Sequence, residues 1–164
     1  MASARVGDDV YGEDPTVKEL EQYSAELMGK EAGLFGASGT QTNLVAMLTH
    51  CTRGDEYIVG QNAHTFKYEG GGAAVLGGIQ PNPLTMGVDG TLQLDDIVAA
   101  IKPEDIHFPK TKLVCLENTH AGMPLPYNYT QEIKQLCERC GLALHLDGAR
   151  VFNAAVFRNL EPLD

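Results

Sequence analysis

The stretch "GLALHLDGARVFNAAV", residues 141–156, places an apolar segment in front of an aspartate and an arginine. Residues 142–147 are apolar apart from a histidine and the closing Asp147, which predicts a buried strand. Only small residues separate Asp147 from Arg150, and an apolar helical pattern begins directly afterwards. In open α/β sheets, ligands bind beyond the carboxyl ends of the strands. The stretch therefore predicts an α/β fold with Asp147 and Arg150 at a candidate ligand site.

The same alternation of strand and helix runs through the rest of the chain. Apolar runs predict strands at 31–35, 56–60, 111–118 and 142–147, and helical periodicity predicts helices at 14–29, 38–51, 91–103 and 130–140. A glycine-rich segment, 66–78, is expected to be helical in part. Nearly continuous apolar strands with helices between them indicate a mostly parallel sheet in one domain.

Composition and charge narrow the class of partner. The chain has 164 residues, of which 43% are apolar, enough for one ordinary core. Its net charge of −10 argues against binding to nucleic acid or to an anionic membrane surface. No apolar run approaches the roughly 20 residues of a membrane-spanning helix, and the first fifteen residues lack the hydrophobic segment of a secretory signal. Four cysteines without a disulfide framework fit a reducing compartment, so we expect a cytoplasmic protein.

The two cysteines of "CERC", residues 137–140, could form a redox or metal site, or they could be structural residues. It lies late in an amphipathic helical pattern, where Ile133, Leu136, Cys137 and Cys140 share one face. We therefore interpret both cysteines as buried structural thiols.

Three polar clusters follow predicted strands: "ASGT" at 37–40, "ENTH" at 117–120 and "DGAR" at 147–150. In the first cluster, Ser38, Gly39 and Thr40 precede a helix, whose free N–H groups and dipole favour an anion. An ordinary helix cap is the alternative for these three residues. Neither a P-loop nor a G-x-G-x-x-G dinucleotide pattern is present.

Asp147 and Arg150 allow two interpretations. A carboxylate at a buried strand end needs a partner, and Arg150 could supply one in an internal ion pair. Alternatively, Asp147 binds a cationic group of a ligand and Arg150 an anionic one. A protonated pyridine nitrogen is such a cation, and one large class of pyridoxal phosphate enzymes uses an aspartate to hold it.

Three histidines lie near the predicted strand ends. His64 could stack on a flat ligand or cap a helix, whereas His120 suits proton transfer because imidazole titrates near neutrality. Glu69 is interpreted as a solvated helix residue. His145 shares a strand face with Asp147, but no third ligand accompanies the pair, and we expect no metal site.

Together these segments resemble a known family. "GDDVYGEDPTV", "SGT" followed by Asn43, "AHTFKYEGGGAA", "DIHFPKTKLVCLENTH" and "HLDGARVFNAAV" are similar to the low-specificity L-threonine / L-allo-threonine aldolases. The resemblance runs from about residue 6 to residue 157. It implies pyridoxal 5'-phosphate as cofactor, an aspartate-aminotransferase-like (type I) fold, and cleavage of threonine or allo-threonine to glycine and acetaldehyde.

The resemblance also implies roles for the cofactor-binding residues. Ser38, Gly39 and Thr40 would hold the cofactor phosphate. His64 would stack on the pyridine ring, and Asp147 would bind the ring nitrogen.

Three further residues receive roles from the resemblance. Arg150 would contact the substrate carboxylate or the ring oxygen. His120 would lie near the substrate hydroxyl and help to move its proton. Tyr11 would approach the site of a neighbouring subunit, because the family's active sites lie at a dimer interface; a homodimer or homotetramer is implied.

In the family, the Schiff-base lysine and the small domain follow the "DGAR" segment. None of the seven lysines in the sequence matches that lysine motif: Lys18, Lys30, Lys67, Lys102, Lys110, Lys112 and Lys134. Residues 1–164 are therefore expected to form part of the pyridoxal phosphate-binding large domain. Two hypotheses follow: an aldolase of which this sequence is a part, or a catalytically inactive fragment that at most binds a partner subunit or cofactor. Another lyase of the same fold, such as a β-eliminating enzyme, is a third.

Overall fold

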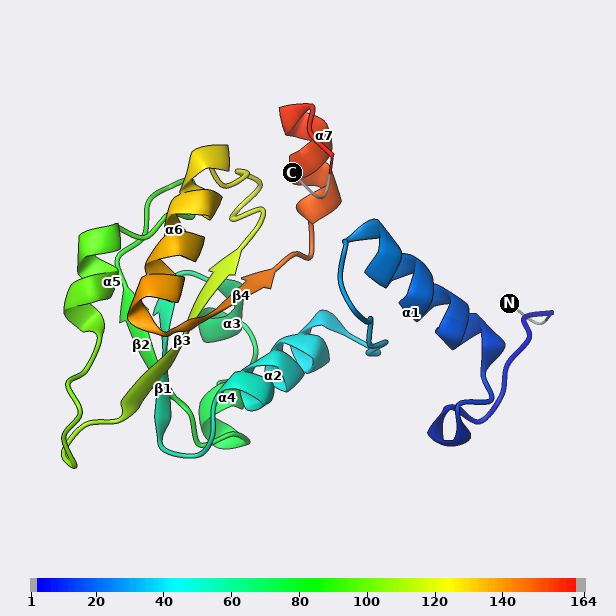
Figure 1. The fold of residues 1–164 in the computed structure, drawn as a ribbon, viewed down its shortest axis with the longest axis horizontal. Coiled ribbons are helices and arrows are strands. Elements are labelled where there is room, and N and C mark those ends of the chain that lie inside the picture. Colours follow the sequence, from blue (N-terminus) through cyan, green and yellow to red (C-terminus); the bar gives the residue numbers. More distant parts are fainter. Residues whose placement is uncertain (1–2, 162–164) are drawn as a thin grey trace.

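The computed structural model describes residues 3–161, which form a parallel four-stranded sheet with helices on both faces (Figure 1). The strands are β1 (Asp55–Gly60), β2 (Gln80–Leu84), β3 (Lys110–Glu117) and β4 (Ala143–Asp147). Their order across the sheet is β2-β1-β3-β4, and every neighbouring pair is parallel. The predicted α/β class with a parallel sheet is confirmed, and all four carboxyl ends point to one edge of the sheet.

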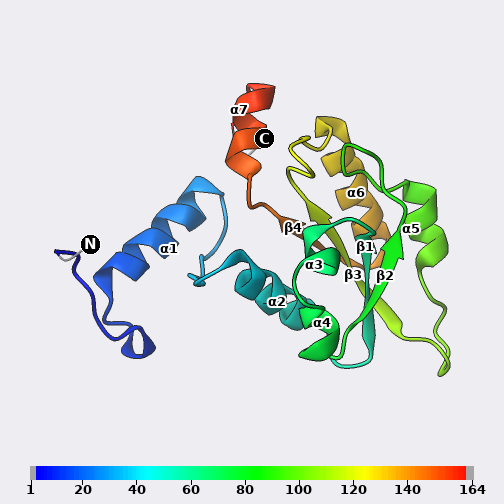
Figure 2. The same cartoon turned by 180° about the vertical axis from the view of Figure 1, so that it is seen from behind.

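The helices divide between the two faces of this sheet. Helices α5 and α6 cover one face, and α2, α3 and α4 cover the other, whereas α1 lies away from the sheet (Figures 1 and 2). Their bounds are α1 (Pro15–Leu27), α2 (Gly39–His50), α3 (His64–Lys67), α4 (Gly72–Val75), α5 (Leu94–Ala100), α6 (Tyr127–Cys140) and α7 (Val151–Arg158), after a 3-10 turn at Asp9–Tyr11. Within residues 3–161, no helix combines the length and the apolar character needed to cross a bilayer.

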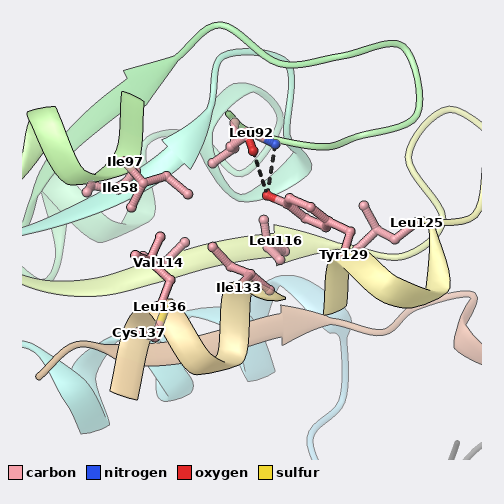
Figure 3. Close-up of a cluster of buried hydrophobic side chains, with 10 residues drawn as sticks. All are labelled: Ile58, Leu92, Ile97, Val114, Leu116, Leu125, Tyr129, Ile133, Leu136 and Cys137. Atoms are coloured by element: carbon pink, nitrogen blue, oxygen red, sulfur yellow. Dashed lines mark hydrogen bonds between the residues drawn. The ribbon is translucent and has the colours of Figure 1, made fainter. Parts of the chain in front are cut away.

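Alternating side chains of the central strands build two cores. Ile58 and Val114 face α5 and α6, where they pack with Ile97, Ile133 and the buried Tyr129 (Figure 3). The intervening residues face the other way and pack under α2 and α4; they are Tyr57, Val59, Leu113 and Cys115. Both faces of β1 and β3 are thus buried, as continuous apolar strands of a parallel sheet require.

Tyr129 fastens α6 to the loop before α5. Its hydroxyl accepts a hydrogen bond from the Leu92 N–H at 2.9 Å and donates one to the Leu92 carbonyl at 3.0 Å (Figure 3). Because both partners are buried, the phenol satisfies two backbone groups that water cannot reach.

All four cysteines are free. Cys51, Cys115 and Cys137 are buried and Cys140 is partly buried. The structural interpretation of the two thiols in α6 is confirmed for Cys137, which lies in the core beside Leu136.

Two strand assignments from sequence differ from the structure. Residues 31–35, predicted as a strand, form none: the Phe35 N–H donates to the Glu21 side chain at 2.7 Å instead of to another strand. Conversely, β2 was not predicted, because Pro81 and Pro83 interrupt it. The sheet tolerates both prolines because β2 is an edge strand, whose outward N–H positions need no partner.

Candidate active site

A cavity of about 570 Å³ opens at the carboxyl ends of β3 and β4. It is lined by six of the predicted site residues: Gly39, Thr40, His64, His120, Asp147 and Arg150. Ser38 directly precedes this lining without belonging to it. Tyr11 lies outside the cavity, in the N-terminal segment beside α1, where its side chain is 77% exposed. The structure therefore brings together residues from four separate parts of the chain.

The start of α2 forms one wall of the cavity. Ser38 caps the helix, since its hydroxyl accepts a hydrogen bond from the Gln41 N–H at 3.2 Å. The first N–H groups of a helix have no partner inside it, and those of Gly39 and Thr40 lie at this wall. A Cβ placed on Gly39 would meet nothing within 4 Å, so open space lies before the helix. Both predicted roles, cap and anion site, are compatible with this geometry.

Asp147 and Arg150 also line the cavity. Asp147 accepts hydrogen bonds from Asn43 Nδ2 at 2.9 Å and from the Ala149 N–H at 3.1 Å. Arg150 forms no ion pair with Asp147, nor with another carboxylate of residues 3–161, so the internal ion pair was the wrong interpretation. Its guanidinium is exposed and lines the cavity.

Asn43 lines the cavity and joins three side chains. Its Nδ2 also donates to Glu69 Oε1 at 2.8 Å, and its Oδ1 lies 2.9 Å from His145 Nε2. Glu69 in turn contacts His64 Nδ1 at 2.8 Å. A hydrogen-bonded chain therefore runs from His64 through Glu69 and Asn43 to Asp147.

One expectation about this region was wrong. Glu69 is not a solvated helix residue, because its side chain is only 5% exposed and bonded at two points. Among residues 3–161, the pair of His145 and Asp147 gains no third ligand, but His64, Glu69 and Asp147 each place one possible ligand atom within 4.8 Å of the others. His145 is not part of this set.

His145 is held neutral by its surroundings. Burial lowers its pKa below the usual histidine value, although the charges of Asp147 and Glu69 act in the opposite direction. A neutral imidazole carries one ring proton, and its position is decided by the hydrogen bond to Asn43.

Glu117 joins the two histidines that line the cavity. Its Oε2 accepts the backbone N–H of His64 at 2.6 Å, and its Oε1 bonds to His120 Nδ1. Gly90 packs against the same imidazole, and a Cβ there would lie 2.8 Å from His120 Cβ. Glu117 and Asp147 are register partners on neighbouring strands, which explains why these groups converge.

Comparisons with known proteins agree with this arrangement. The family model for β-eliminating lyases matches residues 1–162. The chain belongs to the β-eliminating lyase family. It is 60% identical over 156 residues to the low specificity L-threonine aldolase of Escherichia coli K12, covering 95% of this chain and 47% of that protein. A probable low-specificity L-threonine aldolase of Arabidopsis thaliana is 48% identical over 162 residues, covering 95% and 46%.

A solved structure shows the same fold. Leishmania major threonine aldolase superposes with a TM-score of 0.77 at 30% identity, over 88% of this chain and 43% of that one. The chain thus spans about half the length of the curated relatives that it matches. This lyase fold is the type I fold expected from the resemblance.

The lyase-family cavity fits pyridoxal phosphate in its charges and donors. A helix start suited to a phosphate, a carboxylate suited to a protonated ring and the exposed Arg150 line the same cavity. In addition, Thr119 Oγ1 is buried and has no hydrogen-bond partner among the described residues. A polar ligand in the cavity would satisfy such a hydroxyl.

Sequence interpretation missed Asn43, Glu69 and Glu117 as site residues. Two sequence features could have pointed to the first and last of these residues: Asn43 follows Gly39 by one helical turn, and Glu117 ends a strand. Nothing local distinguishes them from surface residues, because each of them also bonds to a partner that lies 26 to 104 residues away.

Proposed function

We propose that the protein is a pyridoxal phosphate-dependent aldolase that cleaves L-threonine or L-allo-threonine to glycine and acetaldehyde. The observation that carries this proposal is the bonding of Asp147, whose two hydrogen bonds come from uncharged donors while Arg150 pairs with no carboxylate of residues 3–161. An acidic and a basic group held apart in one cavity support binding of a zwitterionic cofactor–substrate pair. The threonine aldolase names of the most similar relatives support the substrate class.

We assign the cofactor-binding roles by chemistry. Asp147 holds the ring nitrogen, the N–H groups of Gly39 and Thr40 and the Ser38 hydroxyl bind the phosphate, and His64 lies flat on the ring. When bound, pyridoxal phosphate supplies a protonated ring that withdraws the electrons released as the Cα–Cβ bond breaks. Asp147 keeps that ring protonated through its negative charge.

The substrate is handled by the remaining two residues of the cavity. Arg150 binds the substrate carboxylate or the ring oxygen with its planar guanidinium. His120 receives the proton of the β-hydroxyl at Nε2, because its Nδ1 is bonded to Glu117. Loss of that proton allows the carbonyl of acetaldehyde to form as the carbon–carbon bond breaks.

The proposal also includes an oligomeric state and a cellular location. We place Tyr11 at the site of a neighbouring subunit in a homodimer or homotetramer; its exposure and its position outside this chain's cavity support that role. Four free cysteines support a cytoplasmic location.

Lys67 lies at the cavity, but its Nζ donates to Asn62 Oδ1 at 3.2 Å, and we assign it no covalent bond to the cofactor.

The test is product analysis on the complete protein. It should release acetaldehyde and glycine in equal amounts from L-threonine and L-allo-threonine, and only when pyridoxal phosphate is supplied. Formation of pyruvate and ammonia from L-serine, without acetaldehyde from threonine, would support a β-eliminating enzyme instead. No turnover with any of these amino acids would overturn the proposed activity.

A further inference from the structure

We infer that Asn43 is a positioning residue, which fixes the Asp147 carboxylate for the ring nitrogen and joins it to the Glu69–His64 pair. This inference rests on the proposed function, because it assigns the target of Asp147. The side chain of Asn43 is itself buried, with 5% of the residue exposed. Asn43 lines the cavity, and its side chain is bonded to Glu69, His145 and Asp147.

The orientation of the Asn43 amide follows from its neighbours. One end of the amide faces two carboxylate oxygens, Glu69 Oε1 at 2.8 Å and Asp147 Oδ2 at 2.9 Å. Only an NH₂ group can satisfy both, since an amide oxygen there would face two acceptors. The two N–H bonds of Nδ2 are thereby fully used, one for each carboxylate.

The opposite end of the amide then determines the tautomer of His145. Asn43 Oδ1 accepts hydrogen bonds only, so the His145 Nε2 that lies 2.9 Å away must carry the ring proton. Burial keeps this imidazole neutral, and its Nδ1 is left without a proton. His145 in turn holds the amide in place, which prevents the NH₂ group from rotating away from Asp147.

Asn43 thereby fixes the positions of two carboxylates of like charge. Glu69 and Asp147 place oxygens within 4.8 Å of each other, which is unfavourable unless a donor lies between them. Asn43 supplies that donor without adding charge. Since Oδ2 of Asp147 is committed to Asn43 and Oδ1 accepts the Ala149 N–H, both oxygens are held, and the plane of the carboxylate is set before a ligand arrives.

The first measurement does not need the cofactor. Nitrogen-15 NMR of the histidines in the complete, cofactor-free protein should show His145 as a neutral ring protonated at Nε2. The resonance is assigned by its disappearance from the spectrum of a His145→Gln variant. A His145 ring protonated at Nδ1 alone would reverse the Asn43 amide and overturn the inference.

The second measurement is a double-mutant cycle on the affinity for pyridoxal phosphate. Asn43→Ala should weaken binding about tenfold or more in the presence of Asp147, because a buried charged group loses a hydrogen bond. In an Asp147→Ala background the same substitution should weaken binding less than about threefold, since Asn43 then retains only its contacts to Glu69 and His145. A purely structural role would reduce affinity by equal factors in both backgrounds.

Control variants distinguish a failure of this inference from a failure of the proposed function. Asn128→Ala, on the exposed side of α6, should leave affinity unchanged. If Asn43→Ala does not unfold cooperatively, Asn43→Ser replaces it, because serine retains one hydroxyl donor. Equal factors in both backgrounds, or wild-type affinity of the variant, would overturn the inference alone. Failure of the unmodified protein to bind pyridoxal phosphate would overturn the proposed function and the inference with it, whatever the His145 tautomer.

Discussion

Replacing Glu117 by glutamine distinguishes the contribution of this residue to stability from its contribution to catalysis. The backbone N–H of His64 is a fixed donor, so the amide oxygen of the introduced glutamine must take over the 2.6 Å bond that Glu117 Oε2 accepts. The NH₂ group of the same amide then faces His120 Nδ1 and can only donate to it. His120 must consequently accept at Nδ1 and carry its proton at Nε2, the nitrogen that we expect to receive the substrate proton.

The magnitudes follow from the two bonds of Glu117, whose side chain is 12% exposed. A hydrogen bond to a charged group contributes about 1.5–3 kcal/mol, so Glu117→Ala should cost about 3–6 kcal/mol of the unfolding free energy. Glu117→Gln keeps both bonds without the charge and should cost only about 1–2 kcal/mol. Its kcat should nevertheless fall by at least about 100-fold, the usual contribution of a general base.

The assay pairs denaturant unfolding with acetaldehyde release from L-threonine in the complete protein. Glu138→Gln, on the exposed side of α6, is the matched control and should change neither quantity. Cleavage by Glu117→Gln at more than about a tenth of the wild-type rate would refute the reasoning, since the wrong tautomer would then be harmless. A loss of stability as large as that of Glu117→Ala would refute the bonding argument.

Four further outcomes are expected. Asp147→Ala in the complete protein should cripple threonine cleavage more than it lowers the melting temperature, and near-normal turnover would exclude its assigned role. Borohydride reduction with pyridoxal phosphate should give no stoichiometric pyridoxyl-lysine within residues 1–164; peptide mapping of such an adduct, together with threonine cleavage, would contradict this. Burial raises the pKa of Cys51 and of Cys137 to about 11, so native protein at pH 8 should react with iodoacetamide at Cys140 alone among the four cysteines, as mass spectrometry can check. A polypeptide of residues 1–164 alone should aggregate or bind ANS, because one edge of β4 pairs with no strand in the described part of the chain; a sharp unfolding transition from a monodisperse species would show the opposite.

The sequence by itself determined the fold class and six residues of the cavity lining. Those features depend on local patterns: apolar runs predict β1, β3 and β4, the 3.6-residue period predicts α6, and polar clusters after strands mark the cavity. Helix boundaries differed by a few residues, as for α5, which covers Leu94–Ala100 within the predicted 91–103. The segment 31–35 was misjudged because strand propensity needs a neighbouring strand to be realised.

Only the tertiary structure decided how the site residues are bonded. Arg150 lies three residues from Asp147, yet the aspartate bonds to Asn43, which is 104 residues away in sequence. Glu117 reaches His64 across 53 residues because parallel strands deliver their carboxyl ends to one edge. Such partners are chosen by distance and desolvation in the folded state, and neither quantity is written in the local pattern. Six residues that line the cavity could therefore be predicted from the sequence, whereas the parts played by Asn43, Glu69 and Glu117, and the hydrogen-bond network, required the fold.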